Sequence, residues 1–189
     1  MSLCRITLTL LAVSCLQAAT LELNQSKNQF SFAALRNASM TLNINGTTHF
    51  AKWSPSSRTF TLAADGAEWT ATLTARDTNY LAISSTISNT SQAPIKLVRA
   101  TLADAQLNLG DQTSALLMSG WGVWIGVKPI TSQKQVSKTL TQLYNPKSHA
   151  ALQLGFETFD RINTEQELWF DESSKLIFYT LYRKVATTC

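Results

Sequence analysis

Residues 59–72 alternate between apolar and threonine side chains on both sides of Asp65-Gly66. An Asp-Gly pair favours a two-residue hairpin turn, because both positions tolerate a positive φ angle. This turn sets the cross-strand pairs, which are Leu62 with Trp69, Phe60 with Ala71, Thr61 with Thr70 and Thr59 with Thr72. The predicted hairpin has one apolar face and one threonine face, the pattern of an antiparallel sheet that is buried on one side.

Short strand-like segments follow one another along most of the chain, with turn-rich pieces at 54–57, 89–91 and 145–148 between them. Only 33–36 and 132–138 are compatible with a helical turn. Many short strands with regular turn signals predict an all-β fold, an antiparallel β-sandwich or a barrel, and we favour the sandwich. The further strands are expected at 20–24, 30–35, 40–44, 48–53, 80–87, 95–102, 105–109, 122–127, 139–144, 150–159, 167–170 and 175–182.

The side-chain patterns of two late strands also predict which of their faces are covered. Along 149–161 the even positions up to 156 are apolar and the odd ones are mostly polar, which predicts one core face and one open face. The strand at 175–182 is apolar on both faces and is therefore expected to be covered on both sides. A partner, a second sheet or sequence downstream could cover it, and the last of these would make the domain truncated at its C-terminus.

Residues 1–19 have the order of a secretion signal. Arg5 precedes a mainly apolar run at 6–13, and the small residues Ala18 and Ala19 follow. The alternative is a buried N-terminal strand or helix. Cleavage near Ala18 or Ala19 predicts a secreted or periplasmic protein. A single β-sandwich domain would then cover residues 20–189.

The cysteines bear on processing and on stability. Cys15 ends an Ala-Val-Ser-Cys run that is similar to a bacterial lipobox, so lipid anchoring at Cys15 is an alternative to cleavage near Ala18. Cleavage there leaves Cys189 as the one remaining cysteine, which rules out an internal disulfide in the mature chain. About 170 residues are enough to bury a sizeable core instead.

The charge pattern gives no reason to expect nucleic acid or a membrane span. The net charge is +4, and lysines and arginines are scattered without a basic run. The apolar run near the N-terminus is shorter than the roughly 20 residues of a membrane helix. We therefore expect no nucleic-acid partner and no transmembrane segment.

The five tryptophans are the first candidates for ligand contact. Trp121 and Trp124 lie three residues apart, so a strand would point them to opposite faces, and an outward indole suits the C–H face of a sugar ring. The alternative is that both are buried, one in each layer of the sandwich. Trp53, Trp69 and Trp169 are expected in the core or at an interface.

Carboxylates gather late in the chain, where Glu157 and Glu167 are the candidate acid and base of a glycoside hydrolysis site. A cluster in sequence does not fix a separation in space, so a structural role is the competing interpretation. His49 and His149 are the only histidines, and neither has a second ligand at metal-binding spacing. No metal and no cofactor is expected.

The run 119–124 (Ser-Gly-Trp-Gly-Val-Trp) and the later 154–158 (Leu-Gly-Phe-Glu-Thr) resemble the N-terminal β-sandwich, a supersandwich-like domain, of family 36 glycoside hydrolases, the α-galactosidase type. Trp124 matches the tryptophan of that family's run, whereas Val123 stands where the family usually has serine. The resemblance covers roughly residues 119–160. It implies that the catalytic aspartates belong to a barrel C-terminal to the sandwich, so no position of this chain inherits a catalytic role.

Three functions remain open from the sequence. The first is a non-catalytic sandwich module of a secreted glycoside hydrolase, which packs on a catalytic barrel, shapes the active-site mouth or supports a homo-oligomer. The second is a stand-alone carbohydrate-binding or adhesive domain with an exposed aromatic platform. The third is a small enzyme that uses Glu157 and Glu167, which would require two carboxyl groups about 5–10 Å apart in a cleft.

Overall fold

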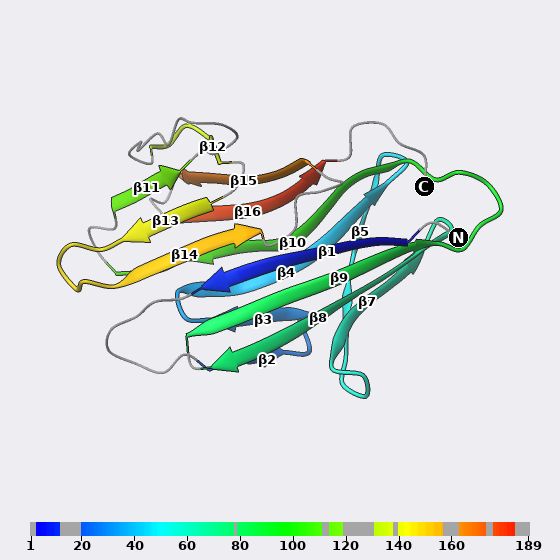
Figure 1. Cartoon of the computed structure of the whole chain (residues 1–189), viewed down its shortest axis with the longest axis horizontal. Helices are drawn as coiled ribbons and strands as arrows, with labels where there is room; N and C mark the ends of the chain where they lie inside the picture. The colour runs from blue at the N-terminus through cyan, green and yellow to red at the C-terminus, as the bar shows by residue number, and fades with distance from the viewer. Residues whose placement is uncertain are drawn as a thin grey trace.

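The computed structural model describes residues 3–11, 20–77, 79–110, 114–118, 131–137, 140–156, 163–172 and 176–183. Within these ranges the chain contains strands and turns and no helix. The strands form two antiparallel sheets that stack face to face (Figure 1). The predicted all-β, antiparallel sandwich is therefore confirmed.

Sheet A lies toward the viewer in Figure 1 and has the order β11-β13-β14-β1-β9-β8-β7-β6. Its strands are β1 (Leu3–Leu11), β6 (Lys52–Ser54), β7 (Thr59–Ala64), β8 (Ala67–Asp77), β9 (Tyr80–Asn89), β11 (Ser114–Met118), β13 (Leu140–Tyr144) and β14 (Ala151–Phe156).

Sheet B lies behind it with the order β12-β15-β16-β10-β4-β3-β2, and β5 also pairs with β4. Its strands are β2 (Glu22–Asn24), β3 (Gln29–Phe32), β4 (Leu35–Ile44), β5 (Thr47–Phe50), β10 (Leu97–Leu107), β12 (Gln135–Ser137), β15 (Asn163–Phe170) and β16 (Leu176–Arg183).

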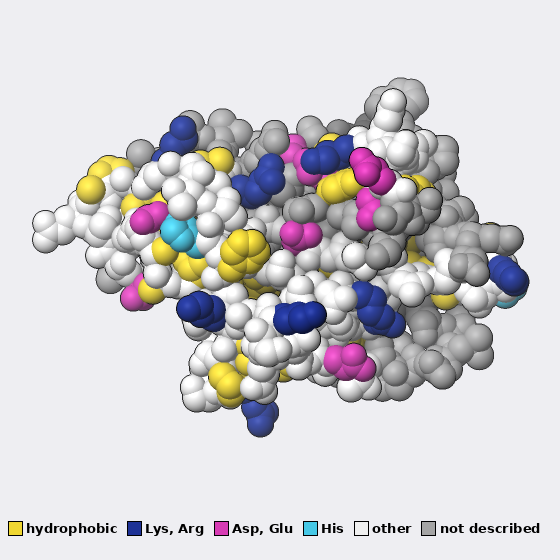
Figure 2. Space-filling model, turned by 180° about the vertical axis from the view of Figure 1, so that it is seen from behind, with side chains coloured by type: hydrophobic (Ala, Val, Ile, Leu, Met, Phe, Trp, Pro, Cys, Tyr) yellow, Lys and Arg dark blue, Asp and Glu magenta, His cyan; other side chains and the backbone are white. Residues whose placement is uncertain are grey.

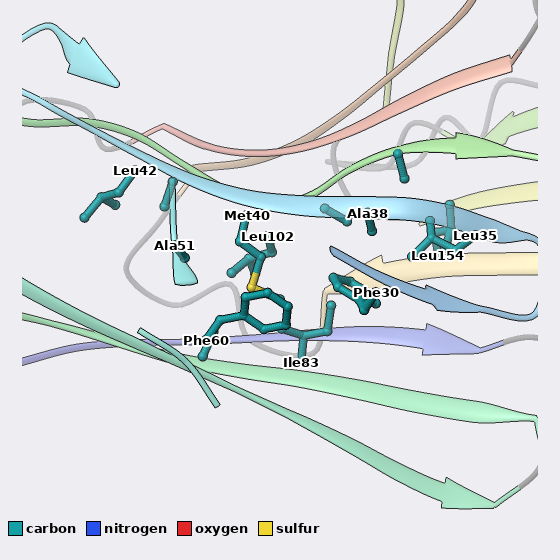
Figure 3. Close-up of a cluster of buried hydrophobic side chains, with 14 of the residues drawn as sticks. Phe30, Leu35, Ala38, Met40, Leu42, Ala51, Phe60, Ile83, Leu102 and Leu154 are labelled. Atoms are coloured by element: carbon teal, nitrogen blue, oxygen red, sulfur yellow. The ribbon is translucent and has the colours of Figure 1, made fainter. Parts of the chain in front are cut away.

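The core fills the space between the two sheets. Phe60 of sheet A contacts Phe30 of sheet B edge to face, with ring centroids 5.9 Å apart, and packs on Trp53 at 5.3 Å. Met40 and Leu102 of sheet B meet Phe60 and Ile83 of sheet A in the same cluster (Figure 3). Large side chains from both layers are thus removed from water together, which is the main stabilising term of a sandwich.

The Asp65-Gly66 hairpin has the predicted register at all four cross-strand pairs. Asp65 and Gly66 take φ angles of 47° and 76°, as the two-residue turn requires. Trp69 on the apolar face is only 1% exposed, so its assignment to the core is confirmed. On the threonine face, Thr70 and Thr72 of β8 are exposed, whereas Thr61 of β7 is half-buried and Thr59 is buried.

Several strand predictions were wrong in their boundaries, and three of them have a clear structural reason. The expected strand 30–35 is interrupted by a two-residue turn at Ala33-Ala34, which also replaces the helical turn expected at 33–36. Ala33 takes a φ of 53° there without any of the residue types that mark such turns. The expected strand 48–53 is divided at Ala51, where the chain leaves β5 of sheet B and enters β6 of sheet A. The buried Ala51 donates its N–H to the Met40 carbonyl at 3.0 Å, which fixes this corner.

The third boundary error concerns β10, which is one strand where two were expected at 95–102 and 105–109. Leu102 and Ala103 are consecutive and both buried, so the apolar alternation breaks in the middle of the strand. The register shifts at the same place, between Thr101 and Asp104 in the pairing with β4. A β-bulge explains both observations.

Other differences are omissions. β11 and β12 were not expected, and a bend at 132–133 followed by β12 stands where a helical turn was possible at 132–138. β15 also begins four residues before the expected 167. The alternation predicted from 150 to 156 is confirmed, since Leu152, Leu154 and Phe156 are buried. The expected strand at 122–127 lies outside the described residues.

The N-terminal segment has a place in sheet A. β1 lies between β9 and β14 and pairs antiparallel with both. These are residues of the expected leader at 1–19, and the structure gives them an internal position in the sheet. Cys4 belongs to β1, whereas Cys15 and Cys189 lie outside the described residues.

We predict that Gly66→Ala lowers the free energy of unfolding by about 2 kcal/mol, because a methyl group is disfavoured at this φ and would also lie 2.7 Å from Ser91 Cβ. Gly46→Ala is the matched control, since Gly46 has a φ of 94° with nothing within 4 Å of the added Cβ. It should lose only about 1 kcal/mol. Urea unfolding of both variants measures the difference, and equal losses would show that the Ser91 contact carries no cost.

Candidate functional site

Most of the residues singled out from the sequence for sugar contact or acid–base chemistry cannot be placed. Trp121, Trp124 and Glu157 lie outside the described residues. Glu167 is described and sits on β15 with only 6% of its surface exposed. Of these candidates, Glu167 can be followed in the structure, and the residues that contact it form the first part of the site.

Glu167 is held by Lys134, which precedes β12. The Lys134 Nζ lies 3.0 Å from Glu167 Oε2, and the same ammonium group stands 4.8 Å from the centre of the Trp169 ring. Lys134 is half exposed, whereas the Glu167 side chain is 8% exposed. A carboxylate bound in this way neutralises a cation and fixes the adjacent indole. This arrangement suits positioning better than proton transfer.

Trp169 also lines an open hollow of about 570 Å³ on the outer face of sheet B. We call it the polar hollow. Its other lining residues are Lys27, Gln29, Asn37, Ser39, Asp104, Ala105, Gln106 and Asp171.

Strand alternation explains why these residues share a face. On β4, Ala38 and Met40 are buried in the core, so Asn37 and Ser39 point outward. On β10 the bulge at Leu102–Ala103 resets the alternation, after which Ala105 and Leu107 are buried and Asp104 and Gln106 face the hollow. Bulges commonly re-aim side chains in this way near functional sites.

The register joins β10 to β15 across β16. Asp104 and Glu167 both pair with Tyr179, and Gln106 and Trp169 both pair with Ile177. Positions two strands apart are separated by roughly 10 Å. Residues 104–106 and 167–169 are distant in sequence, and this pairing brings them to one surface.

The charge of the polar hollow is mixed with a small acidic excess. Among the lining residues that the structure describes, Lys27 is the one cation, against Asp104 and Asp171. Figure 2 shows acidic and basic side chains interspersed among the described residues on this side of the molecule. Such a surface does not favour the phosphate groups of nucleic acids or nucleotides.

A second hollow, of about 740 Å³, lies between β5 and the β7–β8 hairpin. His49 Nε2 is 2.8 Å from Asp65 Oδ2, so this pair joins a strand of sheet B to a turn of sheet A. Phe50, next in the chain, is 66% exposed. The second hollow is lined mainly by threonine, aliphatic and aromatic side chains, with Lys52 and Glu68. It therefore offers fewer planar polar groups than the polar hollow.

The remaining histidine serves a local contact. His149 Nδ1 lies 2.8 Å from the Tyr144 hydroxyl, and the neighbouring Ser148 N–H donates to Asn145 Oδ1 at 3.2 Å within a turn. Across the part of the chain that the structure describes, no three His, Cys, Asp or Glu residues gather as a metal site requires. In the same part, no helix is long and apolar enough to cross a membrane.

The sequence predicted Trp169 in the core or at an interface. The structure places it half-buried outside the core cluster, on the polar hollow, so the core position is wrong and the interface position stays a prediction. The signal was its spacing from Glu165 and Glu167, since the three alternate positions share one face of β15. That face is polar, and the opposite face carries the buried Gln166 and Leu168. Trp53 fits the prediction better, because it packs against the core cluster.

No family model, curated protein or solved structure matches this chain.

We predict that Lys134→Met lowers the free energy of unfolding by about 1–3 kcal/mol, because it leaves the Glu167 carboxylate largely buried without its cation. The double variant Lys134→Met/Glu167→Gln removes both charges and should lose less than Lys134→Met alone. Urea midpoints of the parent, the single and the double variants test this. A single variant as stable as the parent would show that the ion pair does not hold Glu167.

Proposed function

We propose that the chain is a non-catalytic β-sandwich module of a secreted glycoside hydrolase of the α-galactosidase type, and that its polar hollow contacts a neutral saccharide. The observation that carries the saccharide contact is the convergence of Trp169 with Asp104, Gln106 and Asn37 on one open face of sheet B. These residues come from three strands that the core holds in register.

The chemistry of the lining supports a saccharide as the ligand. Sugars present pairs of hydroxyl groups at the ring edge and apolar C–H groups on the ring faces. Carboxylates accept hydrogen bonds from hydroxyl groups, and amides both donate and accept them. The hollow supplies two carboxylates and the amides of Gln29, Asn37 and Gln106, together with one indole. An indole offers the flat apolar surface on which a sugar face can stack.

Other ligand classes fit the hollow less well. The acidic excess of its charged lining opposes phosphate-bearing ligands. Its many planar polar groups would lose their hydration against a wholly apolar ligand, which costs free energy unless the ligand replaces the lost hydrogen bonds. A neutral, hydroxyl-rich ligand avoids both costs.

The resemblance of 119–124 and 154–158 to the family 36 sandwich supplies the enzymatic setting of the proposal. In that family catalysis belongs to a barrel, and the sandwich supports the barrel, shapes its mouth or takes part in an oligomer. Trp121 and Trp124 remain second candidates for sugar contact and belong in the same test. A self-contained binding domain on the cell surface is the alternative, and it would use the same hollow.

We predict that the chain binds neutral oligosaccharides, galactosides among them, and that Trp169→Ala weakens binding about tenfold or more, a loss of about 1.4 kcal/mol. Asp104→Asn should weaken it too, because the amide replaces one acceptor oxygen by a donor. A glycan screen followed by isothermal titration calorimetry measures these affinities, with circular dichroism to confirm folding.

Phe50→Ala is the matched control, since Phe50 is an exposed aromatic residue outside the polar hollow. Its affinity should equal that of the parent. Absence of binding to every neutral glycan, or a Trp169→Ala variant that binds as the parent does, would contradict the assignment. A loss confined to Trp121→Ala or Trp124→Ala would move the contact to those residues.

A further inference from the structure

β1 is an internal strand of sheet A (Figure 1). Each residue from Leu3 to Leu11 has a partner on β9, from Ser88 to Tyr80. On its other side, Leu8 to Leu11 pair with Phe156 to Gln153 of β14. β9 and β14 are far apart in sequence, and β1 is the strand that joins them.

The same nine residues lie within the segment that has the order of a secretion signal. Cleavage near Ala18 or Ala19 would remove β1 from the folded protein. Because neighbouring strands lie about 4.8 Å apart, β9 and β14 would then face each other across roughly 10 Å, the width of one missing strand. We call this space the β9–β14 slot.

An open slot at this place would be costly. Both of its edges would present backbone N–H and C=O groups that had lost their partners. Leu81 and Ile83 of β9 and Leu154 of β14 are fully buried beside β1, so the slot would also expose the core. A stable processed sandwich needs a replacement strand.

We infer that the β9–β14 slot is a strand-acceptor site, which in the processed protein takes an extended strand from a different protein chain. The inference rests on the expected cleavage of the leader and is independent of the polar hollow. β1 serves as the template for the incoming strand, which would run antiparallel to both neighbours and contribute backbone hydrogen bonds along two edges.

The pairing of β1 also indicates which side chains the incoming strand needs at each position. Ile6, Leu8 and Leu10 pair with Ser85, Ile83 and Leu81, which are all buried. The intervening positions of β1 are mostly polar, as in Arg-x-Thr-x-Thr over 5–9. A suitable partner therefore carries a segment of about nine residues in which apolar side chains alternate with threonine-like or charged ones.

The first experiment uses the full chain with a specific protease site inserted within 12–19. After cutting, pairing alone holds residues 1–11. A fluorescent peptide of residues 3–11, with Cys4→Ser to prevent oxidation, should replace the cut strand in a saturable one-to-one manner by anisotropy. The matched peptide that also carries Leu8→Pro should bind at least tenfold more weakly, because Leu8 pairs on both sides and proline removes its N–H.

The second experiment determines the N-terminus and the solution size of the exported protein by intact mass and by light scattering. A start after Ala18 or Ala19, with uptake of the 3–11 peptide by the exported chain, is expected. An exported chain that retains Leu3–Leu11 would overturn the inference, as would equal uptake of the two peptides or uptake of neither. Association of processed copies through β9 and β14 would overturn the assignment to a different chain.

Discussion

The packing of the two sheets against each other determines what the outer surfaces can carry. Phe60 and Phe30 meet between the layers, and burial of Ala38 and Met40 on β4 commits the alternate positions of that strand to solvent. If β4 slipped by one residue, its core-facing side chains would turn to solvent and its outer side chains would turn to the core. The pairing that builds the core therefore also fixes the position of the polar hollow. The β10 bulge shows the same coupling, because it lets Leu102 and Ala103 remain inside while Asp104 turns outward.

The β15 edge shows how a partly exposed aromatic residue can be held in place without being buried. Trp169 has Lys134 over its ring, and Lys134 is in turn bound to Glu167 on the same face of the strand. A ring fixed in this way loses less conformational freedom when a ligand stacks on it, which lowers the entropic cost of binding. In the proposed function the ion pair supports the saccharide-binding surface and takes no part in proton transfer.

The sequence was most predictive where the decisive interactions are local. Asp65-Gly66 and the alternation around it predicted the register of the hairpin, confirmed at all four pairs that were named, because a two-residue turn determines its own register. The corner at Ala51 could not be predicted in the same way, since the choice between two sheets depends on strands elsewhere in the chain. β15 was predicted too short, because it begins at Asn163 and includes the polar residues 163–166. In the structure Gln166 is nevertheless buried, and its amide donates to the Leu154 carbonyl at 3.3 Å.

The N-terminal segment shows that one sequence can satisfy two physical requirements. Export selects for apolar content after a positive charge, whereas a strand needs alternation, and Ile-Thr-Leu-Thr-Leu at 6–10 provides both. The neighbours of β1 are β9 and β14, and β14 ends at Phe156. The slot therefore cannot be completed until most of the chain has been synthesised, and such long-range pairing forms slowly. β9 ends at Asn89, so β1 can pair with β9 before β14 exists, and β14 completes only the second edge. The leader interpretation and the strand position therefore make opposite demands on residues 3–11, since removal of the leader takes away an internal strand of sheet A.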